Sequence, residues 1–250
     1  MAARLIRPLA VSAAVAAVTL AQLNLPNKKV WDDAPLTLYS AVVVLAVVAV
    51  DESVRATVGL IQLHKIREYE RDMRAVLSAS LIILVKKFSP PWDRVGAHAF
   101  QLRGFWRWRH LSNIGGIRIG AEPSMVNPSW KPGKGVVGMA VKQRRGHAVH
   151  WMTTFNNAYQ NGESAWVARP ADERFGLSWG ELMRTDNYVG ITAFPIYDRS
   201  GKLTGCVCID APLTEQELDD PIVQKILRDL ARSVDSLGPP PVGWRQYSHA

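Results

Sequence analysis

The sequence contains only two cysteines among its 250 residues, which excludes a fold stabilised by several disulfide bonds. Cys206 and Cys208 lie two positions apart in a run of β-forming residues, so their side chains share one face of a predicted strand. A disulfide between them would strain that strand. We therefore expect two small, buried, reduced thiols in a cytosolic domain. A redox or ligand-attachment role for the pair is the alternative.

Charged residues are absent from two stretches near the N-terminus. Residues 9–25 and 34–50 are almost entirely apolar or small, and each is about as long as the shortest helix that crosses a bilayer, roughly 17 residues. Lys28, Lys29 and Trp31 lie between them and predict a polar turn at a membrane surface. Residues 1–50 thus predict a transmembrane hairpin. A cleaved signal peptide is the alternative for the first stretch.

The distribution of cations around these stretches predicts the orientation of the hairpin. Cations precede the first stretch and follow the second, and fewer lie in the turn: Arg4, Arg7, Arg55, Lys65, Arg67 and Arg71, against Lys28 and Lys29. Because cation-rich flanks remain in the cytoplasm, we expect a multi-pass protein of the cell membrane with both termini cytoplasmic. The net charge of +8 also allows attraction to anionic lipid, nucleotide or nucleic acid.

Proline is absent from residues 51–87, where Gly59 is the only glycine, so this region predicts a long helix. Residues 51–70 would form a helical stalk. Its apolar stripe is not a regular heptad repeat, so it permits a coiled-coil dimer without requiring one. Residues 75–85 are apolar on all sides and predict a buried helical segment.

Residues 187–210 predict the centre of a second domain. Two β-forming runs flank residues 198–202, which predicts an antiparallel strand pair whose loop uses the positive φ available to Gly201. The first run is apolar on both faces, as in an inner strand. Pro195 lacks a backbone donor and predicts a bulge or a locally unpaired edge. Strands at 95–102 and 111–119 and helices at 136–143 and 221–237 complete the predicted elements.

This strand pair resembles the last strand pair of GAF domains, through residues 194–198 and 201–210. Residues 133–140, Gly-Lys-Gly-Val-Val-Gly-Met-Ala, resemble the glycine-rich strand-to-helix turn of the same family. The resemblance implies an α+β fold, with a GAF-like antiparallel sheet flanked by helices over residues 71–238. The transmembrane hairpin and stalk would precede this domain, and residues 239–250 would form a Pro-rich tail.

Residues 151–181 are polar and aromatic without clear periodicity, which predicts a long functional loop. In GAF domains the corresponding segment lines a small-molecule cavity. The resemblance therefore implies the following ligand contacts: Trp151, Asn156, Trp166, Arg169, Trp179, Tyr188, Cys206 and Cys208. The alternative is that the aromatic residues only cap the sheet.

Residues 105–110 combine aromatic and basic side chains. In an extended conformation Trp106 and Trp108 would share one face, and Arg107 and Arg109 the other. Such a segment is either a half-buried strand with a solvated basic side or a surface that holds bases and phosphates. The glycines at 133 and 135 could likewise receive an anion, although their spacing favours a structural turn.

No arrangement of nucleophile, base or metal ligands is evident, so the sequence predicts a protein that is not an enzyme, and it does not identify a cofactor. We expect a membrane-anchored, GAF-like sensory or binding protein that recognises a small molecule, such as a nucleotide, or a partner on the cytoplasmic side. It would relay this event to the membrane lipid or to a separate output protein.

Three alternatives remain open at this point. The protein could be a ligand-triggered membrane effector, or a scaffold that forms a homodimer through its stalk and C-terminal helices. It could also be a GAF-like thiol redox enzyme that uses Cys206 and Cys208.

Overall fold

The computed structural model of the chain describes residues 2–23, 25, 27–33, 35–105, 108–118, 120 and 130–244, with residues 2–7, 30 and 31 described by their backbone alone. The chain divides into two compact units, residues 1–65 and 66–250. Each unit is described by itself below.

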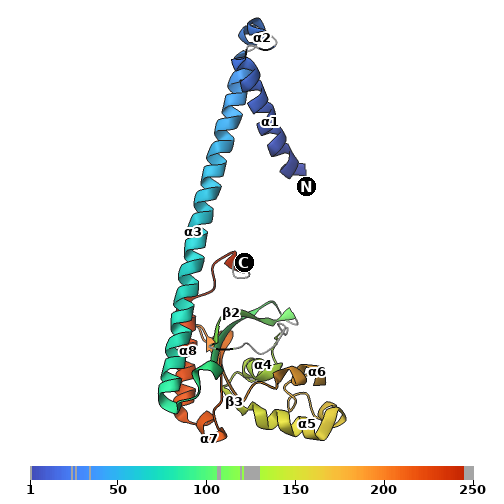
Figure 1. Cartoon of the computed structure of the whole chain (residues 1–250), viewed down its shortest axis with the longest axis vertical. Coiled ribbons are helices and arrows are strands. Elements are labelled where there is room, and N and C mark those ends of the chain that lie inside the picture. The colour runs from blue at the N-terminus through green and yellow to red at the C-terminus, as the bar shows by residue number, and fades with distance from the viewer. Residues whose placement is uncertain are drawn as a thin grey trace. The chain divides into compact units, whose positions relative to one another are not determined.

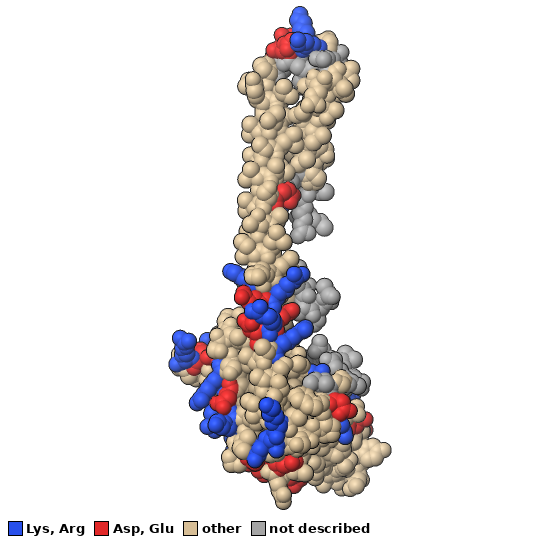
Figure 2. Space-filling view, turned by 60° about the vertical axis from the view of Figure 1, so that its left-hand side comes forward, with Lys and Arg blue, Asp and Glu red and all other residues tan. Residues whose placement is uncertain are grey.

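The first unit is helical. It contains α1 (Ala2–Gln22), α2 (Lys28–Asp33) and the beginning of α3 (Pro35–Phe88), whose remaining residues belong to the second unit (Figure 1). Figure 2 shows an uncharged surface over α1 and the first part of α3, with charged residues at the turn that joins them. Apolar side chains such as Leu9, Leu36 and Val47 are exposed along this surface.

Within the described residues, α3 is the one helix that is long and apolar enough to cross a membrane, and only 6% of its most apolar window is buried. The apolar part of α1, Pro8–Gln22, is shorter than a membrane-spanning helix. The structure thus contains one candidate span, where the sequence predicted two.

The second unit is built on a five-stranded antiparallel sheet with the order β2-β1-β5-β4-β3. Its strands are β1 (Gly96–Arg103), β2 (His110–Arg118), β3 (His147–His150), β4 (Gly190–Tyr197) and β5 (Leu203–Ala211). This sheet confirms the predicted α+β class and the strand pair predicted over residues 187–210. It also confirms the strands predicted at 95–102 and 111–119, to within one residue at each end.

Helices cover both faces of the sheet (Figure 1). The last part of α3 packs with α8 (Pro221–Leu237) and α7 (Glu215–Leu218) on one face, around buried residues that include Met73, Leu77, Val207, Ile209, Leu227 and Leu230. The other face carries α4 (Gly135–Gln143), α5 (Trp151–Ala168) and α6 (Trp179–Leu182), followed by the short 3-10 helix η3 (Met183–Thr185). The 3-10 turn η1 (Trp92–Arg94) links α3 to β1.

Two local predictions are confirmed by the backbone. β3 pairs with β4 only from Gly190 to Ala193, so Pro195 lies where β4 has no neighbour on that side, as its missing N–H requires. In α8 the Asp220 carboxylate accepts a hydrogen bond from the Ile222 N–H at 2.7 Å, Pro221 occupies the first turn, and Gly238 ends the helix at φ 74°.

The prediction of a loop over residues 151–181 is wrong for residues 151–168 and 179–181, which are helical, and is confirmed for the irregular segment 169–178 between them. Residues 151–168 form α5, which is kinked at Gly162 (φ 78°), and residues 179–182 form α6. Trp151, Phe155 and Ala158 recur at helical spacing and pack against one core, but polar residues between them obscured this stripe in the sequence.

Two further predictions need correction. Residues 75–85 are not buried all round, because Ile82 and Ile83 are 42% and 54% exposed. Residues 105–110 do not form an extended strand in their described part: the N–H of Trp108 donates to the carbonyl of Phe105 at 3.1 Å in a tight turn, and both side chains are exposed. Trp106, Arg107 and residues 121–129 and 245–250 lie outside the described residues.

Candidate functional site

The register of the sheet brings charged side chains together on the face covered by α4, α5 and α6. Residues paired across antiparallel strands point to the same face. Asp210 on β5 pairs with Gly96 on β1, and Gly96 pairs with Arg118 on β2. His98 lies two residues along β1 from Gly96 and pairs with Cys208. These pairings gather Arg118, Asp210 and His98 at one end of the face.

Arg118 and Asp210 form a buried ion pair, and His98 lies beside it; the three residues together are called the ion cluster below. The Arg118 guanidinium donates through Nη1 to Oδ2 of Asp210, and His98 Nε2 lies 3.5 Å from Asp210 Oδ1. The side chains of Arg118 and Asp210 are only 8% and 5% exposed. Charges at this depth are stable only when they are paired, because leaving water is costly for each of them.

Two glycines make room for this ion cluster. A Cβ at Gly96 would lie 2.6 Å from Asp210 Oδ1, and a Cβ at Gly116 would lie 2.7 Å from His98 Nδ1. Real Cβ atoms do not approach other atoms so closely, so a larger residue at either position would displace the carboxylate or the imidazole. The backbone of β1 and β2 is thus adapted to hold these side chains.

Arg118 retains hydrogen-bonding capacity. Its Cζ lies 5.6 Å from the centre of the Tyr188 ring, a cation–π contact that covers one face of the guanidinium. Its Nε is buried and has no hydrogen-bond partner within the described parts of the chain. An unsatisfied buried donor costs roughly 1–3 kcal/mol, so an acceptor placed beside Nε would be bound favourably.

The structure brings together six of the eight predicted ligand contacts. Trp151, Trp166, Cys206 and Cys208 are buried in the core on this face, and Trp179 and Tyr188 pack against it. Asn156 is exposed and lies outside this core. Arg169 is also outside it: its guanidinium donates to Asn157 Oδ1 at 2.7 Å and lies 5.6 Å from the Trp166 ring centre.

The two buried tryptophans use their polar atoms within the protein. Trp151 Nε1–H donates to Thr185 Oγ1 at 2.8 Å, and Trp166 Nε1–H donates to the Leu177 carbonyl at 3.2 Å. These bonds fix the two indole rings and attach α5 to the segment that leads into α6 and η3. That the rings contact a ligand stays a prediction.

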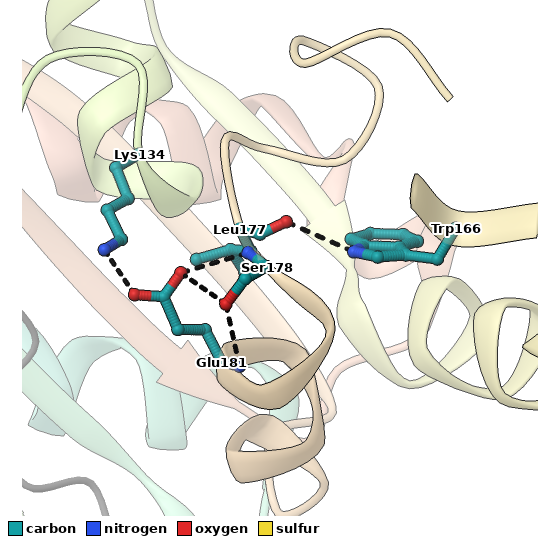
Figure 3. Close-up of polar contacts among 5 residues, drawn as sticks. All are labelled: Lys134, Trp166, Leu177, Ser178 and Glu181. Carbon is teal, nitrogen blue, oxygen red and sulfur yellow. Dashed lines mark hydrogen bonds and ion pairs between the residues drawn. The ribbon is translucent and has the colours of Figure 1, made fainter. Parts of the chain in front are cut away.

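A polar network ties α6 to the turn that precedes α4 (Figure 3). The Lys134 ammonium donates to one carboxylate oxygen of Glu181, and the other accepts from the backbone and hydroxyl of Ser178, each at 3.0 Å. Ser178 Oγ in turn accepts from the Glu181 N–H at 3.3 Å, which completes a capping box. The network holds the helical cover on the sheet.

The glycine-rich turn is structural. The N–H of Gly135 donates to the Phe175 carbonyl and that of Gly133 to the Gly138 carbonyl, both at 2.7 Å. The two glycine amides are therefore already bonded within the protein and are not donors for an anion.

Burial governs the chemistry of the two thiols. It raises the pKa of both Cys206 and Cys208 well above the ordinary value, and Asp210 and Cys206 raise the pKa of Cys208 further. A raised pKa suppresses the thiolate, which is the reactive form of cysteine. Both cysteines are free, as predicted.

Sequence reasoning missed His98, Arg118 and Asp210. One signal was present, since Asp210 shares a strand face with Cys206 and Cys208 and a carboxylate there must find a partner. The partners come from β1 and β2, and their identity depends on strand pairing that the sequence does not display. In the described residues, no group of three or more His, Cys, Asp or Glu side chains could hold a metal ion.

Comparison with solved structures finds GAF domains. The chain matches a GAF domain structure (16% identity, 71% of this chain and 87% of that one, TM-score 0.39). It also matches the GAF domain of an Acinetobacter phosphoenolpyruvate-protein phosphotransferase (12%, 70% and 94%, TM-score 0.36). A third match is a type II free methionine-R-sulfoxide reductase from Thermoplasma acidophilum (14%, 69% and 96%, TM-score 0.41).

No family model matches the chain, and no curated protein matches it. The solved structures are similar in fold alone. With the sheet order and the helices on both faces, the predicted GAF-like fold is confirmed.

The prediction that the chain is not an enzyme is contradicted. Several of the matched structures, from Thermoplasma acidophilum, Staphylococcus aureus and Neisseria meningitidis, are free methionine-R-sulfoxide reductases, which are enzymes. Chains of this fold therefore include catalysts, and the lack of a recognisable catalytic motif in the sequence did not justify the prediction.

The Lys134–Glu181 network predicts a pH-dependent stability. Burial alone would raise the pKa of Glu181, but hydrogen bonds from Lys134 and Ser178 outweigh it, and the net pKa is lowered. The stabilisation is therefore present above the unfolded-state pKa, about 4, and is lost as the pH falls through the folded value. We expect Glu181→Gln to lower the unfolding free energy by about 1 kcal/mol at pH 7 and by progressively less in acid.

Thermal or denaturant unfolding across pH measures this difference. Glu163→Gln, on the exposed surface of α5, is the matched control and should leave stability unchanged at every pH. A loss for Glu181→Gln that is constant down to acidic pH would contradict the assigned role.

The burial of both thiols predicts slow chemistry in the folded chain. We expect Cys206 and Cys208 to react with a thiol-specific reagent roughly 100-fold or more slowly in the native than in the unfolded protein. Ser164→Cys, which places a thiol on an exposed position of α5, serves as the fast-reacting control. Native labelling of the wild-type chain at the control rate would contradict this prediction and would favour a redox role for the pair.

Proposed function

We propose that the protein is a membrane-anchored sensory or binding protein whose GAF-like domain takes a small ligand with an anionic or strongly accepting group. The buried Nε of Arg118, which has no partner in the described residues, carries this proposal. The ligand group would be held on the α4–α6 face of the sheet, beside the ion cluster of Arg118, Asp210 and His98.

The chemistry of arginine supports an anionic group. The planar guanidinium presents several N–H donors and binds carboxylates and phosphates through two of them at once. Asp210 takes the donor at Nη1, which leaves Nε for a second acceptor. Tyr188 and Trp179 lie on the same side of the sheet and offer aromatic surface for the rest of a small molecule.

The exposed apolar surface of the first unit supports a membrane anchor. In water, each Å² of apolar surface that remains unburied forgoes about 25 cal/mol of stabilisation. The most apolar window of α3 is only 6% buried, and its side chains have no charged neighbours before Asp51. Lipid would cover this surface, with α1 beside it as the second, shorter element. The flanking cations favour cytoplasmic termini.

The helix α3 is the element through which binding could be relayed. Its N-terminal part carries the apolar window, and its C-terminal part contributes Met73, Leu77 and Leu81 to the core of the second unit. A ligand can act on α3 only if it binds two conformations of the domain with different affinity. The recipient would be the membrane anchor itself or a separate output protein.

A second candidate function is homodimerisation, and the surface of α3 and α8 favours it. A groove of about 710 Å³ runs between these helices, with Val76, Ile83 and Ile226 among its lining residues. Lys225 and Asp229 also line it. In an isologous interface that pairs Lys225 of one copy with Asp229 of the other, two-fold symmetry would form this ion pair twice. We propose a second copy of the chain as the occupant of this groove.

The ligand proposal predicts a selective thermal stabilisation. Arg118→Gln alone would leave a buried carboxylate unpaired and cost roughly 3–5 kcal/mol, so the Arg118→Gln/Asp210→Asn double variant is the better test. We expect at least one carboxylate- or phosphate-bearing compound to raise the Tm of the full chain in detergent, by an amount equivalent to about 2.7 kcal/mol at 100 times its Kd. The double variant should not respond.

Arg228→Gln, which removes an exposed cation from α8, is the matched control and should respond as the wild type does. Stabilisation by neutral compounds only, or an equal response of the double variant, would contradict a ligand held by Arg118.

The dimer proposal predicts that Ile83→Glu shifts the full chain from dimer to monomer. Ile83 is 54% exposed and lines the groove, so a buried carboxylate there would disrupt a dimer without disturbing the fold of the monomer. Native mass spectrometry in detergent gives the mass of the assembly. Val167→Glu, at an exposed position of α5, is the control and should remain dimeric. A wild-type chain that is monomeric throughout would refute this interface.

A further inference from the structure

A basic cavity lies on the second unit, apart from the ion cluster. It has a volume of about 360 Å³ and is lined by Arg109, Lys131, Pro132, Val141, Lys142, Arg144 and Leu203. These residues come from the segment before β2, the segment before α4, the end of α4 and the start of β5. No acidic residue is among them.

The charges around this cavity are mostly uncompensated. Lys142 forms an ion pair with Asp172 at 2.6 Å. Within the described parts of the chain, no carboxylate pairs with Arg109, Lys131 or Arg144, and all three side chains are exposed. Cations are favourable at the C-terminus of a helix, which accounts for Lys142 and Arg144 at the end of α4. It does not account for Arg109 and Lys131, which lie outside any helix.

Two strongly exposed aromatic side chains precede Arg109 in the sequence. Phe105 and Trp108, on the turn between β1 and β2, are 82% and 83% exposed. The turn is tight, since the Trp108 N–H donates to the Phe105 carbonyl at 3.1 Å. Gly104 adopts φ 87°, and a Cβ there would collide with the Trp108 carbonyl. The backbone thus presents both rings to the outside, directly before Arg109 in the sequence.

We propose that these residues, Phe105, Trp108, Arg109, Lys131 and Arg144, form an aromatic–basic surface that binds an anionic lipid surface. Aromatic rings enter the interfacial region of a bilayer while neighbouring cations contact the lipid phosphates. Lipid would cover the two rings, so they need no packing contact with other side chains of the protein. The proposal rests on the membrane anchor proposed above, which would keep the surface within reach of a bilayer.

Proteins that bind single-stranded nucleic acid use the same residue types, so this ligand must be distinguished from a lipid surface. In such proteins a basic groove follows the nucleic-acid backbone, and the bases stack on aromatic rings that lie along this groove. Phe105 and Trp108 instead project almost fully, and neither lines the basic cavity. Projecting rings suit insertion among lipid headgroups better than stacking.

Docking of this surface would be an equilibrium between free and membrane-bound states of the second unit. Each cation near an anionic membrane contributes about fivefold to the bound-to-free ratio. Removal of three cations should therefore lower that ratio by roughly 100-fold. Because the anchor makes docking intramolecular, the equilibrium depends on lipid composition and not on protein concentration.

The test uses the full chain reconstituted into nanodiscs of phosphatidylcholine alone or of phosphatidylcholine with phosphatidylglycerol. An environment-sensitive fluorophore is attached through Phe105→Cys, and the wild-type chain, labelled in parallel, sets the background from the buried native thiols. Brominated lipids report insertion by quenching the fluorophore. Trp108→Cys provides a second reporter position on the same turn.

We expect quenching in the anionic nanodiscs and little in phosphatidylcholine alone. The Arg109→Gln/Lys131→Gln/Arg144→Gln variant should lose the quenching, while Arg184→Gln/Arg199→Gln/Arg228→Gln, with the same change of net charge on exposed positions outside both the aromatic–basic surface and the α3–α8 groove, should keep it. Both triple variants change exposed side chains, and an unaltered Tm confirms that they fold.

Four results would overturn the proposal. They are quenching that is independent of lipid charge, quenching that survives in the Arg109/Lys131/Arg144 variant, equal loss in the Arg184/Arg199/Arg228 control, and a fluorescence response to inorganic phosphate or an oligonucleotide at matched ionic strength. Carbonate extraction of native membranes tests the anchor separately. A chain that resists extraction but shows no quenching refutes the lipid-binding surface and leaves the anchor intact.

Discussion

The buried ion pair between Arg118 and Asp210 is the constraint on which the site depends. Both faces of the sheet are covered by helices, so a charge on either face must find its partner within the protein. Asp210 stands on the inner strand β5 and reaches Arg118 across Gly96, whose missing side chain leaves the necessary space. The pair therefore depends on the register of three strands, and it leaves the guanidinium with a buried donor directed at the α4–α6 side.

Polar contacts elsewhere in the second unit hold α4, α5 and α6 over this face of the sheet. Trp151 and Trp166 attach α5 to the neighbouring segments, and Lys134 attaches α6 to the turn before α4 through Glu181. The same helices also bury an apolar cluster against the sheet, which includes Val137, Ala140 and Leu182. Under the proposed function, a ligand would reach Arg118 only when part of this cover opens. The opposite face, formed by α3 and α8, is apolar and connects the sheet to the helix that carries the proposed anchor.

Local patterns allowed much of the fold to be predicted. The residues of each segment and the family resemblance predict the strand pair around Gly201, the end of the β3–β4 pairing before Pro195 and the capped helix α8. The helix α5 was missed because its apolar stripe is short and interrupted by polar residues. The ion cluster was missed for a different reason: Arg118 and Asp210 are 92 positions apart, and only the pairing of β2, β1 and β5 brings them together. The aromatic residues predicted to contact a ligand lie on the α4–α6 face, but Asn156 and Arg169 do not lie in its core.

The proposed function requires that the domain recognise a small anionic molecule through a buried arginine and that apolar helices hold it at a membrane. Native mass spectrometry of the full chain, released directly from the membranes in which it is made, tests this most directly. We expect the wild-type chain to carry a small acidic molecule as a mass adduct, and the Arg118→Gln/Asp210→Asn variant, folded and in the same membranes, to carry none. The same adduct on both chains, or none on either, would contradict it.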